Sequence, residues 1–537
     1  MDVAAAAGRA LRAQGVDHVF GVVGSGNFHV TNALVAAGAR FVPAAHEGGA
    51  ASMADGYARV SGRLAVLSVH QGPGVTNALT GLTEAAKSRT PLVVLAPEAT
   101  NPRSNFFVDL PGLAAAVGAE FRRVGAERAA AAVAAACRLA TAGAGRTVVL
   151  ALPLDVQAMA AGGGSVPPAP MPAEVGALSP LVEALGAARR PVFIAGRGAR
   201  RARAALTALA DRCGALLAVS AAAKGLFVGD PWYLDVSGGF ATPLCAELVA
   251  RADLVVAWGS TLNMWTTRHG RLIPPAAVVA QVDVDPAALG VHRPVDIAVA
   301  GDVAAVAAAC ADGLGTPPSG WRTPELRARI AAEGRWRDVS YVDEGSGDRI
   351  DPRTLTIALD DLLPAERTVV VDSGNFMGYP SMFLSVPDVA GFCFTQAFQS
   401  IGLGLASALG AAVARPDRLT VAALGDGGFL MSVAELTTAV RLGLPLVVVV
   451  YDDAAYGAEV HHFGPHGHPL DTVTFPDADL AAIARGFGCA SATVRGPGDL
   501  AAVRDWLAGS RDRPLVVDAK VVSSRGSWWL AEAFRGH

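Results

Sequence analysis

Two aspartates stand where a metal could bind, because each follows a short apolar run that predicts a buried strand. Asp426 comes directly after the run ending at residue 424 and Gly425, and Asp453 closes the run at residues 444–451. If the two runs are neighbouring strands, both carboxylates lie at one edge of a sheet. Carboxylate oxygens are the ligands that magnesium and calcium prefer. The pair therefore predicts a divalent metal site.

Glycines beside the first aspartate extend this predicted site. Gly427 and Gly428 leave backbone N–H groups open next to a predicted helix N-terminus, which suits a phosphate group. A metal and a phosphate at one place imply a phosphorylated cofactor or substrate. A glycine turn with two solvated aspartates is the alternative for so short a motif, and the order of the surrounding elements decides against it.

The elements that must position these residues form a strand–helix–strand unit. A turn at residues 425–428 leads into a predicted helix over residues 433–442, which Ser432 and Glu435 would begin as a capping box and Gly443 would end. A helix between two apolar strands makes those strands parallel neighbours. Ligands bind at the carboxyl edge of such sheets.

A second group of polar residues lies in the first hundred residues. Glu47 begins a predicted helix in HEGGAASMADGYAR, residues 46–59, where complementing the helix dipole is its alternative role. His70 and Gln71 open the loop HQGPGVTN after a predicted strand. An imidazole can move protons near neutral pH, and a strand-end histidine bonded to the backbone is the alternative for His70.

Together these motifs resemble those of the thiamine diphosphate-dependent enzymes, which include acetolactate synthase, benzoylformate decarboxylase and pyruvate decarboxylase. GDGGF, an acidic doublet and then Tyr-Gly resemble the cofactor-binding pattern, and residues 46–59 resemble the family's H-E-x-x-A-x-x-x-A-x-G-Y-A-R segment. The chain looks closest to acetolactate synthase large subunits. The resemblance implies an α/β fold of three doubly wound, mainly parallel domains: pyrimidine-binding (1–165), central and nucleotide-fold-like (175–340), and diphosphate-binding (350–537).

The resemblance also implies roles for individual residues. Asp426, Asp453 and the backbone carbonyl of Ala455 would hold magnesium. Glu47 would bind the pyrimidine ring and favour its reactive tautomer, with His70 and Gln71 beside the reacting centre. The other implied cofactor contacts are Gly374, Asn375, Gln399, Ile401, Gly425, Gly427, Gly428, Tyr456 and Gly457. Ile401 would hold the cofactor in a bent conformation, and an ordinary core position is its alternative.

Two features depart from the family pattern. The family usually has an asparagine doublet where this chain has Asp452 and Asp453, so a negative charge is added beside the diphosphate. Acetolactate synthases carry Gln-Trp about where His461 and His462 stand. These histidines are candidates to bind a substrate carboxylate or phosphate, with surface histidines as the alternative.

Two further residues that are candidates to contact the substrate lie near the N-terminus. Ser25 matches a substrate-contacting serine of the benzoylformate decarboxylase branch, and His29 follows it closely in the sequence.

Composition limits the other functions open to the chain. The 537 residues are 52% hydrophobic, with a net charge of −4 and no basic run, which argues against nucleic-acid binding. Six scattered cysteines without C-x-x-C are typical of reduced thiols. The N-terminus lacks a signal-peptide core, and no apolar run approaches the ~20 residues of a membrane span. We therefore expect a cytoplasmic protein.

The combined expectation is a thiamine diphosphate- and magnesium-dependent lyase or transferase that decarboxylates a 2-oxo acid and joins the product to a second carbonyl. The alternatives are simple decarboxylation, flavin-linked oxidation of a 2-oxo acid, and a non-catalytic homologue. FAD, without a redox role, stays open for the turn Gly196-Arg197-Gly198. The resemblance also implies a homodimer or homotetramer with active sites between subunits.

Overall fold

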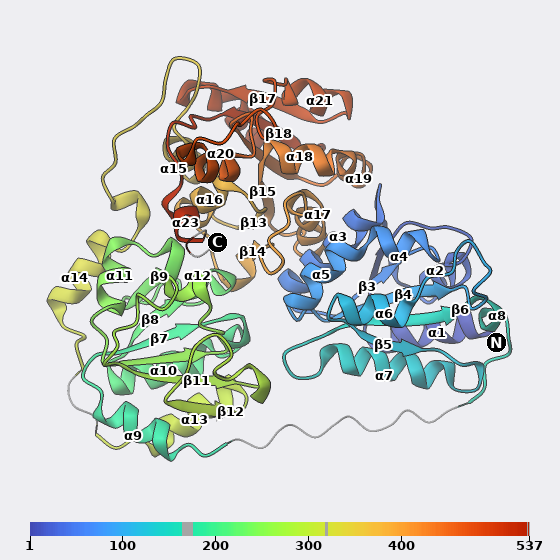
Figure 1. Cartoon of the computed structure of the whole chain (residues 1–537), viewed down its shortest axis with the longest axis horizontal. Coiled ribbons are helices and arrows are strands. Elements are labelled where there is room, and N and C mark those ends of the chain that lie inside the picture. The colour runs from blue at the N-terminus through green and yellow to red at the C-terminus, as the bar shows by residue number, and fades with distance from the viewer. Residues whose placement is uncertain (164–175, 317–319, 534, 536–537) are drawn as a thin grey trace.

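Three six-stranded sheets organise the chain, and every recorded strand pair in them is parallel (Figure 1). The computed structural model describes residues 1–163, 176–316, 320–533 and 535. The strand order reverses direction once in the second sheet and twice in the first and third, so helices cover both faces. The expected fold class is confirmed. The limits of the three expected domains stay predictions, and most of the first linker, around residues 161–173, lies outside the described residues.

The first sheet has the order β2-β1-β3-β4-β6-β5. Its strands are β1 (His18–Gly21), β2 (Arg40–Pro43), β3 (Ala65–Ser68), β4 (Leu92–Glu98), β5 (Glu120–Arg123) and β6 (Thr147–Pro153). Its helices are α1 (Val3–Ala13), α2 (Phe28–Ala36), α3 (Glu47–Ser61), α4 (Pro73–Asn77), α5 (Leu79–Lys87), α6 (Leu110–Ala116), α7 (Ala129–Thr141) and α8 (Leu154–Gln157).

The second sheet has the order β12-β11-β10-β7-β8-β9. Its strands are β7 (Pro191–Ala195), β8 (Leu216–Val219), β9 (Tyr233–Val236), β10 (Leu254–Trp258), β11 (Val278–Asp283) and β12 (Ile297–Ala300). The helices of this part are α9 (Ser179–Ala187), α10 (Arg203–Cys213), α11 (Pro243–Val249), α12 (Met264–Thr267), α13 (Val303–Gly313) and α14 (Pro324–Glu333).

The third sheet has the order β14-β13-β15-β16-β18-β17. Its strands are β13 (Arg367–Val371), β14 (Phe392–Phe394), β15 (Leu419–Gly425), β16 (Leu446–Asp452), β17 (Ala490–Val494) and β18 (Leu515–Lys520). Its helices are α15 (Pro352–Leu362), α16 (Gly378–Phe383), α17 (Gly404–Ala414), α18 (Asp426–Ser432), α19 (Leu436–Leu442), α20 (Gly457–Phe463), α21 (Leu480–Gly486), α22 (Ala501–Ala508) and α23 (Trp528–Ala533).

The strand–helix–strand unit predicted around Asp426 is confirmed in its topology. β15 and β16 are parallel neighbours, and Gly443 ends α19 in the left-handed region with φ of 60°. Successive β15 residues enter different cores, Val421 on one face and Ala422 on the other, because both faces are covered by other elements.

Two details of that prediction are wrong. No free turn separates strand and helix, since α18 begins at Asp426 directly after β15. Ser432 and Glu435 form no capping box: the Ser432 hydroxyl donates to the Gly428 carbonyl, and the Glu435 carboxylate accepts from the backbone N–H groups of Ala45 and His46. A long-range contact with the N-terminal part of the chain therefore takes the glutamate that the local pattern assigned to a cap.

Helices α3 and α17 join the first and third parts of the chain (Figure 1). They approach closely because two glycines lie at their crossing. A Cβ on Gly56 would lie 2.3 Å from the Ser407 carbonyl oxygen, and a Cβ on Gly410 would lie 1.9 Å from that of Met53. Any larger residue at either position would push the two helices apart.

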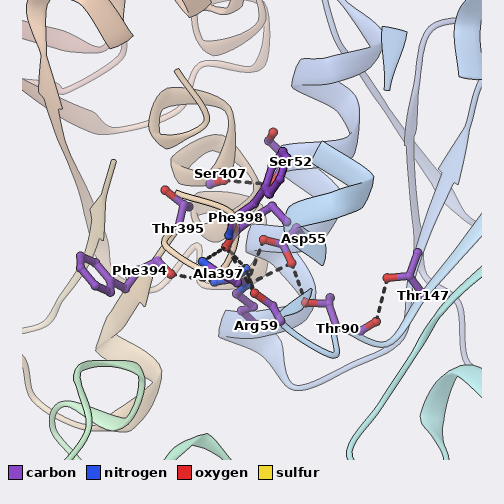
Figure 2. Close-up of polar contacts among 12 residues, drawn as sticks. Ser52, Asp55, Arg59, Thr90, Thr147, Phe394, Thr395, Ala397, Phe398 and Ser407 are labelled. Atoms are coloured by element: carbon purple, nitrogen blue, oxygen red, sulfur yellow. Dashed lines mark hydrogen bonds and ion pairs between the residues drawn. The ribbon is translucent and has the colours of Figure 1, made fainter. Parts of the chain in front are cut away.

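A buried charge network lies beside this crossing (Figure 2). Arg59 of α3 donates to the carboxylates of Asp55, at 3.0 Å, and Glu84, at 2.6 Å, and to the Phe394 carbonyl at 2.8 Å. Burial raises the pKa of Asp55, although its partner Arg59 opposes that shift. The guanidinium thus ties the N-terminal helices to the end of β14.

No helix in the described part of the chain is both long and apolar enough to cross a membrane.

Candidate active site

A cavity of about 630 Å³ lies at the carboxyl edge of the third sheet. The segments that follow β13, β15 and β16 line it, together with Trp265 from the second part of the chain and Arg525 near the C-terminus. Parallel sheets bind ligands at this edge. The sequence-predicted residues that line the cavity are Gly374, Asn375, Gln399, Ile401, Gly425, Asp426, Gly427, Gly428, Asp453, Ala455, Tyr456 and Gly457.

The two predicted metal ligands lie at the ends of adjacent strands and share this cavity. Asp426 is 5% exposed, and burial together with the Asp453 carboxylate raises its pKa to about 8. Burial and the neighbouring Asp452 raise the pKa of Asp453 to about 7. A divalent cation would supply the missing positive charge for these crowded carboxylates. The donor set therefore fits magnesium.

The backbone after β16 presents the third expected ligand. Ala454 lies in the left-handed region with φ of 55°, and its carbonyl accepts a hydrogen bond from Phe475 N–H at 2.8 Å. The N–H of Tyr456 donates to the Val473 carbonyl, also at 2.8 Å. These bonds fix the loop on both sides of Ala455, and Ala455 lines the cavity.

Among the described residues, no group of three or more His, Cys, Asp or Glu side chains is placed to hold a metal. The expected set has two carboxylates and a backbone carbonyl, so it depends on ligands beyond the side chains.

Asp452, the first residue of the acidic doublet, does not line the cavity. It is 2% exposed, and its carboxylate pairs with Lys520 Nζ at 2.5 Å. The carboxylate of Asp452 is therefore paired with a cation from the neighbouring strand β18.

Glycines at the cavity are required by close contacts. A Cβ on Gly457 would lie 2.3 Å from Asp453 Oδ2, and a Cβ on Gly427 would lie 2.6 Å from the Tyr456 ring. Gly374 has φ of 140°, a conformation that other residues rarely adopt. At these three positions the cavity is lined by backbone without a side chain, which suits a ligand with many acceptor oxygens.

The loop that carries Gln399 and Ile401 is held at both ends by carboxylates. Glu84, from α5, accepts from the N–H groups of Ala397 at 3.1 Å and Phe398 at 2.6 Å. Asp372 accepts from Gly402 N–H at 2.8 Å. Gln399 itself has φ of 62°, so the loop is a constrained structure that the cross-domain contacts must support.

Glu47, His70, Gln71, Ser25 and His29 all lie outside this cavity. Glu47 is the first residue of α3, as expected, and its Oε2 accepts from the Asn77 side-chain amide at 3.0 Å. Ser25 and His29 are exposed.

His70 is oriented by the glycine loop that precedes α2. Its Nδ1 accepts the N–H of Gly26 at 3.3 Å, and its ring packs edge-on against Phe106. The neutral imidazole therefore carries its proton on Nε2. Gln71 is buried at 4% exposure, and its Oε1 has no hydrogen-bond partner within the described residues.

His461 and His462 lie on α20 and do not line the cavity. Burial lowers the pKa of His461, and a Cβ on Gly526 would lie 3.0 Å from the His461 Cβ. The His462 ring packs edge-on against Phe463. Both histidines are half-buried on this helix.

Several lining residues were missed by sequence reasoning. Ser373 and Gln396 face the cavity and hydrogen-bond to each other at 3.2 Å, while Trp265 and Arg525 come from distant parts of the chain. Ser373 is adjacent to a predicted contact and could have been included. Nothing in the local sequence of Trp265 marks it, because its place depends on how the second and third parts pack.

Family comparisons agree with this geometry. Residues 1–105 match the thiamine pyrophosphate enzyme N-terminal TPP binding domain, residues 178–310 the central domain, and residues 372–519 the C-terminal TPP binding domain.

Individual proteins are similar over most of the chain. Sulfoacetaldehyde acetyltransferase of Rhodobacter capsulatus is 30% identical, with 84% of this chain and 82% of that protein covered. The acetolactate synthase isozyme 2 large subunit of Escherichia coli is 28% identical, with 97% and 96% covered.

A solved structure shares the fold. The thiamine diphosphate-dependent 4-hydroxybenzoylformate decarboxylase of Rhodococcus jostii RHA1 superposes with a TM-score of 0.82 at 22% identity, over 98% of this chain and 100% of that one. At this identity the likeness shows the fold alone. With its first and last parts matching TPP binding domains and its length covered by relatives, the chain belongs to the thiamine pyrophosphate enzyme family.

Proposed function

We propose that this enzyme uses thiamine diphosphate and magnesium to decarboxylate a 2-oxo acid and join the product to a second carbonyl compound, as acetolactate synthases do. The observation that carries the proposal is the pair Asp426 and Asp453, buried together at adjacent strand ends of one cavity. The two relatives described above are by name a synthase and an acetyltransferase, which favours ligation over simple decarboxylation.

The residues of the cavity divide into two roles in this proposal. Asp426, Asp453 and the Ala455 carbonyl would hold magnesium, and the bare backbone at Gly427 and Gly428 would receive the diphosphate. When bound, the cofactor supplies the nucleophilic carbon and the electron sink for loss of carbon dioxide.

The remaining roles belong to residues of the first part of the chain. Glu47 would donate a hydrogen bond to the pyrimidine ring, and Gln71 would orient groups beside the reacting centre. His70 would transfer the proton on Nε2 to an oxygen or carbon of the substrate, since its Nδ1 is occupied by Gly26 N–H.

These residues support an assembly of at least two copies. No residue of the described segment 1–163 lines the cavity that Asp426 and Asp453 share. Glu47 and His70 can therefore act at this cavity only if a second copy brings its own first domain to it. We propose a homodimer or a larger homo-oligomer on this ground.

Simple decarboxylation is the second candidate, and His70 favours it. A proton on Nε2 would complete that reaction by protonating the product carbon. Flavin-linked oxidation has less support, because the turn at Gly196 and Gly198 packs on backbone. A Cβ on Gly196 would lie 2.3 Å from the Gly259 carbonyl oxygen, so close packing explains that glycine without a nucleotide.

The test is a product assay on the purified protein with thiamine diphosphate and magnesium. A panel of 2-oxo acids is supplied alone and with aldehyde or 2-oxo acid acceptors, and products are identified by mass. The proposal expects ligated products that require both partners. Free aldehyde as the sole product, whatever acceptor is present, would favour the decarboxylase candidate, and consumption of oxygen with each turnover would favour the oxidase.

A further inference from the structure

Lys520 and Asp452 form a buried ion pair behind the metal site. They lie opposite each other in the parallel register of β18 and β16. Lys520 is 2% exposed, and its Nζ lies 2.5 Å from Asp452 Oδ2. A lysine is almost never fully buried unless it is paired.

The lysine also connects two further elements. Its Nζ donates to Asp477 Oδ1 and to the Ala478 carbonyl, each at 2.7 Å, and lies 3.3 Å from Asp518 Oδ2. Burial opposes the charged form of Lys520, but Asp452 and Asp477 raise its pKa overall. The ammonium therefore stays charged and fixes Asp452 in one orientation.

The other oxygen of Asp452 binds the loop after β16, which carries the expected metal ligands Asp453 and Ala455. Asp452 Oδ1 accepts the N–H of Ala454 at 3.0 Å, the residue held in the left-handed region. Ala454 stands between Asp453 and Ala455, which both line the cavity. The carboxylate thereby stabilises the backbone conformation in which both residues line the cavity.

We propose that Lys520 and Asp452 are a positioning pair for the magnesium site. Lys520 places a positive charge against Asp452, which it shares with Asp477 and Asp518, and fixes Asp452 so that its other oxygen can hold the N–H of Ala454. The inference rests on the proposed magnesium and thiamine diphosphate binding. The proposal explains why a buried lysine accompanies the aspartate at position 452. An asparagine at that position would need no cation behind it.

The test compares Lys520→Met, Asp452→Asn and the double variant by calorimetric titration of thiamine diphosphate at fixed magnesium, and of magnesium at fixed cofactor. Lys520→Met removes the cation that fixes Asp452, so its carboxylate no longer holds the N–H of Ala454 between the two ligands. It should raise the magnesium concentration for half-saturation about tenfold or more, the usual effect of losing a partner behind a metal ligand. The double variant should return to within about threefold of wild type, because the uncharged amide that replaces the Asp452 carboxylate needs no cation.

Lys224→Met is the matched control. Lys224 is also a buried lysine, at 4% exposure, and donates to the Ser381 carbonyl at 2.6 Å, away from the cavity lining. Its loss should lower the melting temperature without shifting the magnesium midpoint.

The possible results separate the pair from the proposed function. An unchanged magnesium midpoint in Lys520→Met, or a double variant no better than the single one, overturns the inference while the proposed function stands. A wild-type protein that binds no magnesium with thiamine diphosphate overturns the proposed function first. If Lys520→Met does not fold, a soluble, magnesium-binding double variant supports the pair, and an unfolded double variant contradicts it.

Discussion

Asp426 begins α18 and Asp453 follows β16, so the two carboxylates close adjacent parallel strands and share one cavity. Burial and the Asp453 carboxylate together raise the pKa of Asp426 to about 8. Two crowded carboxylates are unfavourable until a cation joins them. The protein without ligands therefore carries an electrostatic cost at this edge of the sheet that metal binding would remove.

This cost predicts a joint effect of metal and cofactor on stability. Magnesium and thiamine diphosphate together should raise the melting temperature by several degrees, since ligands that bind only the folded state stabilise it by about 2.7 kcal/mol at a hundredfold excess over Kd. Either one alone should do much less. Scanning fluorimetry with EDTA as the reversing agent measures this, and equal stabilisation by cofactor without any divalent metal would contradict it.

His70 should be needed for turnover and not for cofactor binding. Because its Nδ1 is held by Gly26 N–H, replacing it by alanine removes an oriented proton donor, and turnover should fall by about 10²–10⁴-fold. Cofactor affinity should be unchanged. Steady-state kinetics on the identified substrate measures the loss, with exposed His292→Ala as the control.

The His70 variant also separates its two proposed roles. If His70 serves ligation, His70→Ala should release more free aldehyde relative to ligated product. Wild-type turnover in this variant would make His70 a structural histidine.

Active-site sharing between copies predicts complementation. Glu47→Gln and Asp426→Ala should each be inactive, and a mixed population should recover part of the activity, because one mixed site in a dimer would hold both native residues. The measurement is activity after the two variants are dissociated and reassembled together. A fully active monomer in sedimentation analysis would rule out the shared site.

Glu84 should be a strong contributor to stability because it anchors the loop before Ile401. Glu84→Ala removes the acceptor of Ala397 and Phe398 N–H and a partner of buried Arg59. Breaking such a buried pair costs about 3–5 kcal/mol. Denaturant unfolding should show this loss, whereas Glu247→Ala, which breaks a half-exposed pair with Arg329, should cost at most about 1 kcal/mol. Equal losses in the two variants would contradict the anchoring role.

Local sequence predicted the elements whose causes are local. The apolar runs before Asp426 and Asp453 predict strands, and β15 and β16 lie there in the structure. Asp426 and Asp453 could be predicted to share a site from the strands that they follow, because a parallel sheet brings strand ends to one edge. Most of the twelve predicted residues that line the cavity were instead implied by the family resemblance.

The errors share a cause in distant contacts. Glu435 looked like a cap because its real partner, Ala45, lies 390 positions away. Strand β18 was not predicted, since Asp518 and Lys520 interrupt its apolar run. Lys520 is buried among partners from other elements, including Asp452 of β16. β14 was missed because it has three residues. Trp265 reaches the cavity through packing between two parts of the chain, which no local pattern records.

The central claim is that Asp426 and Asp453 hold the metal that binds thiamine diphosphate, and calorimetry of cofactor binding in magnesium tests it most directly. Wild type should bind, and Asp453→Asn should still bind because an amide oxygen is also a ligand. Asp426→Ala should show no binding at any magnesium concentration at which wild type saturates. Undiminished cofactor affinity in Asp426→Ala would contradict the assignment.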